Sequence, residues 1–119
     1  MQINELTVTG NLTKDPELKY TPQGAAVCNL YIAINRTYKT KNSDEMKKET
    51  VFINVVVWGK DAEDYGNVLS KGQEVLIMGR LTQRSWENQE GKKITVTEIR
   101  ANHIIPTPKR ERTEGDNNG

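Results

Sequence analysis

The chain has 119 residues, a formal net charge of +1, and a composition of 34% hydrophobic and 28% charged residues. These values fit one small domain and exclude a protein that binds polyanions through bulk positive charge, so a nucleic-acid contact requires cations gathered on one face. No apolar run approaches the ~20 residues of a membrane helix, and the N-terminus lacks a signal-peptide pattern. With the single cysteine Cys28 no intrachain disulfide can form, and we expect a cytoplasmic protein.

The first third of the chain predicts two strands. Residues 3–12 alternate between apolar and polar positions, which is typical of a half-buried strand, and Gly10 indicates a bulge or tight bend. Residues 13–24 contain two prolines and a glycine and predict an ordered loop or short hairpin. Residues 25–38 predict a long strand. Its apolar face consists of Cys28, Leu30, Ile32 and Ile34.

Residues 49–60 predict the third strand. Because side chains of a strand alternate between its two faces, the odd positions form one apolar face, which we assign to the core. These positions are Val51, Ile53, Val55 and Val57. The even positions include Phe52 and Trp58, which point away from that core. Either a second protein layer covers these two aromatic rings, or a flat ligand binds on them.

The second half of the chain predicts one short helix and two more strands. Residues 60–72 change to helical spacing, with Tyr65 assigned to the helix core and a stop at Lys71–Gly72. Residues 73–81 return to alternation, with Gly79 at a core position, and residues 82–105 predict a hairpin around Glu90–Gly91 followed by a final strand.

Five strands with a helix between the third and the fourth match the element order of the five-stranded Greek-key oligonucleotide-binding barrel. We therefore predict an all-β domain with one short helix over residues 1–105. The glycines inside two strands support strong curvature, whereas a β-sandwich usually has more strands. Residues 106–119 combine two prolines with mixed charges and no apolar side chain, so we predict a disordered C-terminal tail.

The sequence offers no catalytic constellation. It contains one histidine, His103, and one cysteine, and no cluster has the spacing of metal ligands. Phosphate-binding and dinucleotide-binding glycine motifs are absent, and the paired carboxylates fall in polar, solvated segments. We predict a protein that is not an enzyme and that has no catalytic residues, no metal and no cofactor.

Aromatic residues and cations lie side by side at several points of the sequence. The neighbours are Tyr38 with Arg36 and Lys39, Trp58 with Lys60, and Trp86 with Arg84. This interleaving is typical of single-strand binders, because bases stack on aromatic rings for ~1–3 kcal/mol each while lysine and arginine contact the phosphates. The pattern predicts single-stranded nucleic acid as the partner.

Each aromatic residue also has a structural interpretation. Trp58 could instead pack beneath the helix that follows it, and Phe52 could fill a minor core. Trp86 precedes a polar loop and Tyr38 begins a charged one, which favours exposure of both. Tyr31 shares parity with two asparagines, which favours a place on the sheet surface or in a subunit contact.

Taken together, the motifs over residues 3–105 resemble the bacterial single-stranded DNA-binding proteins. The similar segments, in order, are VTGNLTKDPELKYTPQGAAVCNLYIAINRTY, EMKKETVFINVVVWGKDAE, LSKGQEVLIMGRL and RSWENQEGKKITVTEI. The resemblance implies a homotetramer of oligonucleotide-binding barrels that coats single-stranded DNA in replication, recombination and repair, without metal or cofactor. It implies base stacking on Tyr38, Phe52, Trp58 and Trp86, and phosphate contacts from Lys60, Lys71 and Arg84.

The tail departs from the family pattern. The family ends in an acidic tip that closes on Pro–Phe and recruits replication and repair proteins, whereas this chain ends in KRERTEGDNNG. We therefore attribute no partner recruitment to the tail.

Two other functions compete with DNA binding. A protein-interaction or primosome-type accessory module would use Tyr31 and the strand surfaces for protein contacts, and the aromatic–cation interleaving argues against it. A cold-shock-like RNA binder would prefer RNA to DNA of equal sequence. Tight, salt-sensitive binding to oligo(dT) distinguishes DNA binding from the protein-interaction module, and a preference for RNA supports the RNA binder.

Overall fold

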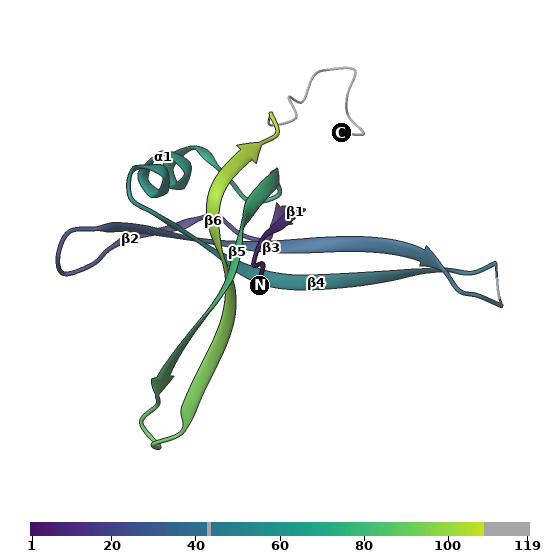
Figure 1. Cartoon of the computed structure of the whole chain (residues 1–119). Helices are drawn as coiled ribbons and strands as arrows, with labels where there is room; N and C mark the ends of the chain where they lie inside the picture. Colours follow the sequence, from purple (N-terminus) through teal and green to yellow (C-terminus); the bar gives the residue numbers. More distant parts are fainter. Residues whose placement is uncertain (43, 109–119) are drawn as a thin grey trace.

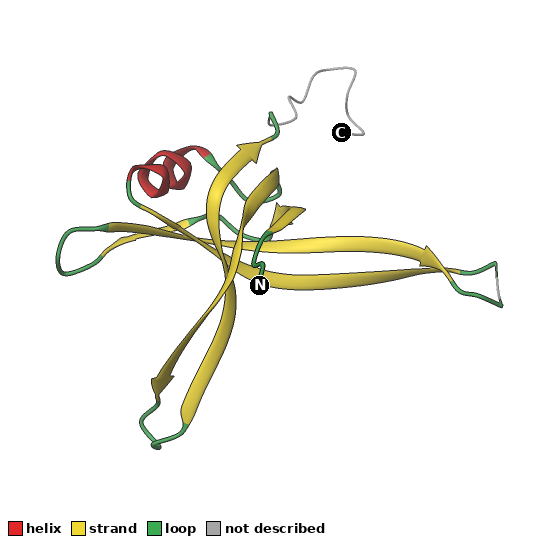
Figure 2. Cartoon of the chain, viewed as in Figure 1, coloured by secondary structure: helices red, strands yellow, loops and turns green. Residues whose placement is uncertain are grey.

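Six strands and one helix make up the computed structural model, which describes residues 1–42 and 44–108 (Figure 1). The elements are β1 (Leu6–Leu12), β2 (Glu17–Tyr20), β3 (Ala26–Lys39), β4 (Met46–Trp58), α1 (Lys60–Val68), β5 (Glu74–Glu87) and β6 (Lys93–Pro106). The prediction of an all-β domain with a single short helix is confirmed (Figure 2). The predicted hairpin of residues 13–24 contains β2, a short strand that pairs with β3.

The five long strands close into a barrel. The hydrogen-bonded order is β1–β5–β6–β4–β3, with β2 added at the outer edge of β3. β1 reaches across to β3 at Asn11 and Leu12, which completes the ring. The contact of β4 with β6 is parallel, as a Greek-key connection through α1 and β5 requires, and the other pairings are antiparallel. The predicted oligonucleotide-binding barrel is therefore confirmed.

The barrel interior holds the alternating apolar positions of the strands. The most completely buried side chains are Leu12, Cys28, Leu30, Ile32, Val55, Val75, Ile77 and Ile99, each 2% exposed or less. Most of these positions share the parity predicted from the sequence. Complete burial of a Val, Leu or Ile side chain stabilises a fold by about 1.5–3 kcal/mol, so this cluster provides the main stability of the barrel.

Two glycines allow strands to approach closely at the barrel corners. A Cβ atom on Gly79 would lie 2.1 Å from the carbonyl oxygen of Arg100, and one on Gly10 would lie 2.7 Å from that of Ala33. The β5–β6 register also shifts between Met78 and Gly79. Glycine is required at both positions because a side chain there would collide with the neighbouring backbone, and the predicted irregularity is found at Gly79.

The helix α1 covers one end of the barrel, where it contacts β2, β3 and β4 (Figure 1). Ala62 of this helix is completely buried, and the hydroxyl of Tyr65, also in the helix, donates a hydrogen bond of 2.9 Å to the backbone carbonyl of Ile104. The helix ends at Val68, before the predicted stop at Lys71–Gly72. Val68 shares the helical spacing of Ala62 and Tyr65 but is exposed.

Two hairpins continue beyond the barrel as arms (Figure 2). We call them the β3–β4 arm (residues 34–51) and the β5–β6 arm (residues 82–97). The assignment of Val51 to the core is wrong, since 48% of its surface is exposed and it lies where β4 has left the barrel. Leu81, which shares the parity of Val75 and Ile77 in β5, is 46% exposed although its partner in β6, Ile99, is buried in the core. The alternation of apolar and polar residues along β4 thus continues into the β3–β4 arm, where there is no barrel core to bury the apolar side chains.

The chain leaves the barrel at the end of β6. Pro106 closes this strand, and Thr107 donates backbone and hydroxyl hydrogen bonds to the carbonyl of Glu74, so order extends two residues past the predicted boundary at 105. Residues 109–119 of the predicted tail lie outside the described residues. Across residues 1–42 and 44–108, no helix has the length and apolarity to span a membrane.

Candidate nucleic-acid interface

Phe52 and Trp58 lie on the side of the sheet that faces away from the barrel core. The β3–β4 register sets Phe52 opposite Ala33 and Trp58 opposite Val27, so both rings point to the same side. Phe52 is 73% exposed and Trp58 is 41% exposed, which excludes burial of either ring within this chain. We call this side the outer face. Its residues are Tyr31, Phe52, Asn54, Val56, Trp58, Arg84, Trp86, Glu98 and Arg100.

The outer face crosses four strands. The parallel β4–β6 contact pairs Val56 with Arg100, and the antiparallel β5–β6 ladder pairs Arg84 with Val96 and Trp86 with Ile94, which extends the same side to the β5–β6 arm. A groove runs over this junction. It is lined by Val27, Asn29, Val56, Trp58, Thr82, Gln83, Arg84, Glu98 and Arg100.

The outward-facing side of β4 is not exposed along its whole length, as Val56 shows. It shares the parity of Phe52 and Trp58, yet it is only 9% exposed. Neighbouring long side chains from β4, β5 and β6 surround it at the bottom of the groove. The outer face therefore has an apolar floor of its own below the exposed rings.

Each tryptophan of the chain lies beneath a guanidinium group. The Arg84 guanidinium lies 4.9 Å from the ring centroid of Trp86, and that of Arg100 lies 5.6 Å from the ring of Trp58. Such cation–π pairs hold a ring in place and keep a positive charge next to it. A single strand that stacks on either ring therefore has a positive charge close by.

Arg84 is anchored by a buried carboxylate. Its Nε and Nη2 donate hydrogen bonds of 2.9 and 3.2 Å to the two carboxylate oxygens of Glu98, which is 3% exposed. The pair raises the pKa of Arg84, chiefly through these hydrogen bonds. Glu98 thus fixes the Arg84 guanidinium, which in turn lies over the ring of Trp86. The phosphate contact predicted for Arg84 would come from a guanidinium whose charge is partly offset by this carboxylate.

The same carboxylate organises the amides of the outer face. Asn54 Nδ2 donates to Glu98 Oε2 at 2.6 Å and to Asn29 Oδ1 at 3.2 Å, which uses both of its N–H groups. Both amide donors of Asn54 therefore bind protein atoms and are not available to a base edge.

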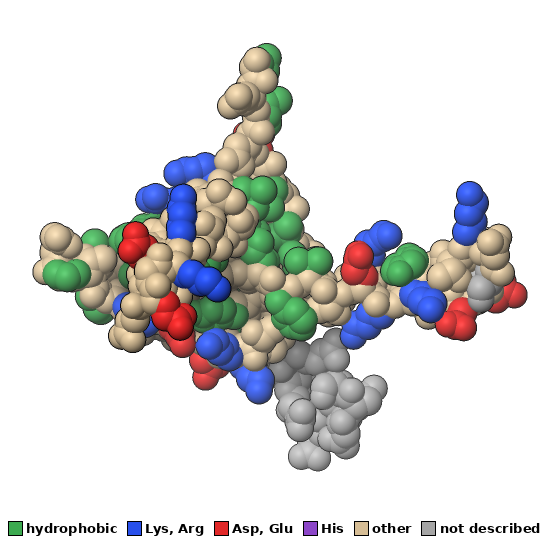
Figure 3. All heavy atoms as spheres, turned by 90° about the horizontal axis from the view of Figure 1, so that it is seen from below, with side chains coloured by type: hydrophobic (Ala, Val, Ile, Leu, Met, Phe, Trp, Pro, Cys, Tyr) green, Lys and Arg blue, Asp and Glu red, His purple; other side chains and the backbone are tan. Residues whose placement is uncertain are grey.

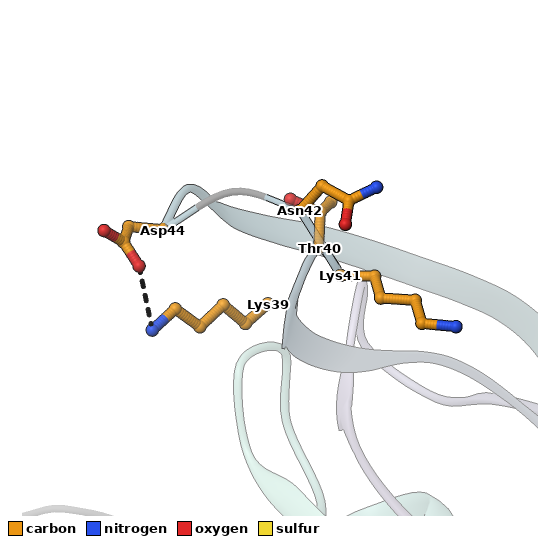
Figure 4. Close-up of a pocket in the computed structure, with 5 residues that line it drawn as sticks. All are labelled: Lys39, Thr40, Lys41, Asn42 and Asp44. Atoms are coloured by element: carbon orange, nitrogen blue, oxygen red, sulfur yellow. Dashed lines mark ion pairs between the residues drawn. The ribbon is translucent and has the colours of Figure 1, made fainter.

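The predicted cations of the β3–β4 arm are paired with acids. Arg36 lies 3.7 Å from Glu49 and also stacks over Tyr38 at 5.1 Å, and Lys39 lies 3.3 Å from Asp44 at the arm tip (Figure 4). Lys41 extends away from that pair (Figure 4). Positive and negative side chains are interspersed along this arm (Figure 3).

Tyr38 does not share a side with Phe52. The register pairs Tyr38 with Lys47 and Arg36 with Glu49, positions of the opposite parity to Phe52 and Ala33. The structure thus brings Phe52, Trp58, Trp86 and Arg84 onto the outer face, and it places Tyr38 and Arg36 on the reverse side of the arm. The four predicted aromatics therefore do not all lie on one side of the sheet.

The two remaining predicted cations flank the barrel. Lys60 begins α1, two residues after Trp58, and forms an exposed i,i+4 ion pair of 3.7 Å with Asp64. Lys71 follows the helix, and its backbone N–H donates a 2.8 Å hydrogen bond to Asp15 in the loop before β2. Both side chains are exposed, as a phosphate contact requires.

Sequence reasoning missed Arg100, Glu98 and the surroundings of Tyr31. Arg100 and Glu98 share a parity in the final strand, which signals a common face, but only the β4–β6 contact shows which ring lies nearby. Within residues 1–42 and 44–108, no group of three or more His, Cys, Asp or Glu side chains is arranged to hold a metal ion.

The geometry leads to a comparison with known proteins. Residues 3–106 match the single-strand binding protein family. The chain belongs to this family. Single-stranded DNA-binding protein A of Bacillus subtilis is 43% identical over 102 residues, which cover 86% of this chain and 58% of that protein. Single-stranded DNA-binding protein 2 of Listeria monocytogenes is 41% identical over 114 residues, which cover 95% and 69%.

Solved structures share the barrel. The wild-type single-stranded DNA-binding protein of Thermus aquaticus superposes with a TM-score of 0.76 at 31% identity, covering 91% of this chain and 52% of that one. A Plasmodium falciparum SSB in complex with ssDNA gives a TM-score of 0.81 at 24% identity, covering 91% and 97%, and this likeness concerns the fold. The present chain spans about half the length of the Thermus protein.

Proposed function

We propose that this protein binds single-stranded DNA without sequence preference, and that it coats and protects the strand in replication, recombination and repair in the bacterial cytoplasm. One observation carries the proposal. Phe52, Trp58 and Trp86 are exposed on one continuous face, and both tryptophans lie beside an arginine. The names of the bacterial relatives support the same ligand.

The proposed mechanism is stacking with electrostatic tracking and no chemical step. The stacking residues are Tyr38, Phe52, Trp58 and Trp86, and the phosphate contacts are Arg36, Lys39, Lys60, Lys71 and Arg84. Every base has a flat π-face, so stacking of ~1–3 kcal/mol per base does not select a sequence. The amide network of Asn54 supports this, because its donors are already bound to protein atoms. No metal or cofactor takes part in the proposed mechanism.

We also propose that the barrel assembles into a homotetramer. β1 pairs with β5 along residues 6–11 but with β3 only at Asn11 and Leu12. Among the described residues, the other edge of Leu6–Thr9 has no strand partner, and an open edge is suited to pairing with a second copy. Sedimentation equilibrium tests this: a species of four chains is expected, and a monomer at micromolar concentration contradicts it.

A titration with labelled oligonucleotides tests the DNA-binding proposal. Fluorescein-labelled oligo(dT) is titrated with protein at 50 and 300 mM salt, with oligo(U) and duplex DNA of equal length as controls. We expect tight binding to oligo(dT), weak binding to duplex, and affinity that falls with salt in proportion to the phosphates contacted. Binding to duplex at equal affinity, or no binding to DNA, contradicts the proposal, and the second result favours a protein-interaction module.

A further inference from the structure

The outer face contains a second aromatic contact beside Phe52, built around Tyr31. A hollow opens between these two rings. It is lined by Thr13, Tyr31, Ile32, Phe52, Ile53 and Asn54. Tyr31 is half-buried and Phe52 is exposed, so one wall of the hollow is fixed in the sheet and the other projects from it.

The strand register sets the spacing of the two rings. Tyr31 pairs with Asn54 and Ala33 pairs with Phe52, so Tyr31 and Phe52 are diagonal neighbours on one side of an antiparallel pair. Such diagonal positions lie about 7–8 Å apart, which is within reach of aromatic side chains and leaves room for one flat ring between them. The hollow beside Tyr31 and Phe52 is the space between these two diagonal positions.

The Tyr31 ring is held by contacts on its other sides. Its hydroxyl donates a 2.9 Å hydrogen bond to Glu17 Oε1 in β2, and the Lys14 ammonium lies 4.1 Å from the ring centroid. Lys14 does not line the hollow, so its ammonium covers one face of the ring while the hollow opens on the side of Phe52. A ring fixed in this way loses little conformational entropy when a base stacks on it.

Lys14 is placed there by the backbone. Thr13 donates two hydrogen bonds to the carbonyl of Tyr31, one of 2.8 Å from its N–H and one of 3.1 Å from its hydroxyl. Lys14 then forms an ion pair of 3.5 Å with Glu17, and both side chains are about half exposed. Exposed pairs of this kind contribute little, so a phosphate can take the place of the carboxylate at the ammonium.

We infer that the outer face holds one nucleobase of a single strand between the rings of Tyr31 and Phe52, with the neighbouring phosphate on Lys14. This subsite rests on the proposed function. It accepts any base, because the nearest amide, that of Asn54, has both N–H donors bound to Asn29 and Glu98. Tyr31 lies opposite Asn54, which is between Phe52 and Trp58 in β4. The subsite therefore lies on the path of a single strand that runs from Phe52 to Trp58 across the sheet.

Binding measurements on matched variants test the subsite. Tyr31→Leu removes one stacking partner and is expected to weaken binding to oligo(dT) about tenfold. Tyr31→Phe keeps the ring and is expected to bind within twofold of the wild type. Tyr20→Leu removes an exposed tyrosine whose partner in β3, Ala26, faces the core, and it is also expected to stay within twofold. Lys14→Gln is expected to lower the slope of log K against log salt by about 0.7.

Photocrosslinking provides a second measurement on the wild-type chain, independent of any folding defect in a variant. Oligo(dT) carrying 5-iododeoxyuridine is irradiated with the protein, and the adducts are mapped by mass spectrometry. We expect adducts on Tyr31 and Phe52 together with those on Trp58.

Three results overturn the subsite. Adducts on Trp58 without any on Tyr31, combined with wild-type affinity of Tyr31→Leu, reject it while the proposed function stands. A change of sedimentation in Tyr31→Leu that accounts for its whole loss of affinity makes Tyr31 a subunit contact instead. Failure of the wild-type chain to bind oligo(dT) removes the proposed function and the subsite together.

Discussion

The barrel and its arms use the same alternation of side chains for different purposes. In the barrel, one face of each strand is sealed, and Leu30, Val55 and Ile77 have no exposed surface. In the arms both sides of the ribbon meet solvent, and the charges form exposed pairs such as Arg36–Glu49. The comparison teaches that stability resides in the barrel, whereas the outer face and the arms are free to carry ligand-binding side chains at little cost to folding.

The largest expected effect comes from removing the two outermost rings of β4. In the double variant Phe52→Ala, Trp58→Ala, two stacked bases lose their platform, so affinity for oligo(dT) is expected to fall by about 2–6 kcal/mol, a factor of about 30 or more. The loss of thermal stability is expected to be smaller than for a core substitution, because Phe52 and Trp58 are 73% and 41% exposed. Fluorescence anisotropy and calorimetry measure the two quantities. A variant that unfolds but keeps its affinity per folded molecule places these rings in the core.

The converse variant acts on the barrel alone. Ile77→Ala leaves a cavity at a completely buried position of β5, and the free energy of unfolding is expected to fall by about 2–5 kcal/mol. Affinity per folded molecule is expected to stay within twofold, because Ile77 points away from the outer face. Denaturant titration at one fixed protein concentration checks the first value, since subunit assembly makes stability depend on concentration. A tenfold loss of affinity in fully folded Ile77→Ala would contradict the claim that the barrel core and the outer face act independently.

A third prediction uses the buried thiol of the barrel. Burial raises the pKa of Cys28 from its ordinary value of 9.0 to about 11. The unfolded chain then loses this proton near pH 9 while the folded chain keeps it. The contribution to stability is therefore constant below pH 9 and is lost between about pH 9 and 11, by about 2–3 kcal/mol.

The control for this prediction is Cys28→Ala. Other groups also titrate at alkaline pH, so the measured quantity is the difference between wild type and variant in the free energy of unfolding. We expect this difference to shrink as pH rises from 9 to 11. A difference that is independent of pH shows that the thiol ionises without hindrance in the folded chain.

The smallest effect is expected in the β3–β4 arm. Glu49→Gln removes the acid beside Arg36. Since exposed ion pairs contribute about 0–1 kcal/mol, the free energy of unfolding is expected to fall by no more than about 1 kcal/mol. The freed guanidinium is expected to improve affinity for oligo(dT) by about two- to threefold at low salt. Glu5→Gln, at an exposed position just before β1, changes the net charge by the same amount and serves as the charge control. Weaker binding of Glu49→Gln indicates that the acid orders Arg36 for the DNA.

Much of the barrel could be predicted because strand alternation is a local property. Cys28, Leu30 and Ile32 are buried at the predicted parity, and Gly79 lies where the strands approach too closely for a side chain. The same argument failed at Val51, because alternation does not show where a hairpin leaves the core, and at Leu81, which is exposed although its partner Ile99 is buried.

The candidate site could be predicted in its residue types but not in its arrangement. Phe52, Trp58 and Trp86 follow from parity and from neighbouring cations. The pairing of Arg84 with the buried Glu98, and the contact of Arg100 with Trp58, depend on strands far apart in the sequence. The position of Tyr38 on the reverse side of the arm depends on the register of β3 with β4, which the charged loop between them conceals.

The most direct test of the account is the tryptophan fluorescence of two single-tryptophan variants, Trp58→Phe and Trp86→Phe, titrated with oligo(dT) and with duplex DNA of equal length. Each variant reports one site, the first on the β5–β6 arm and the second on the barrel. We predict that the single strand quenches both and that the duplex quenches neither. Absence of quenching in both variants, at concentrations where a labelled oligonucleotide is bound, contradicts stacking on the outer face.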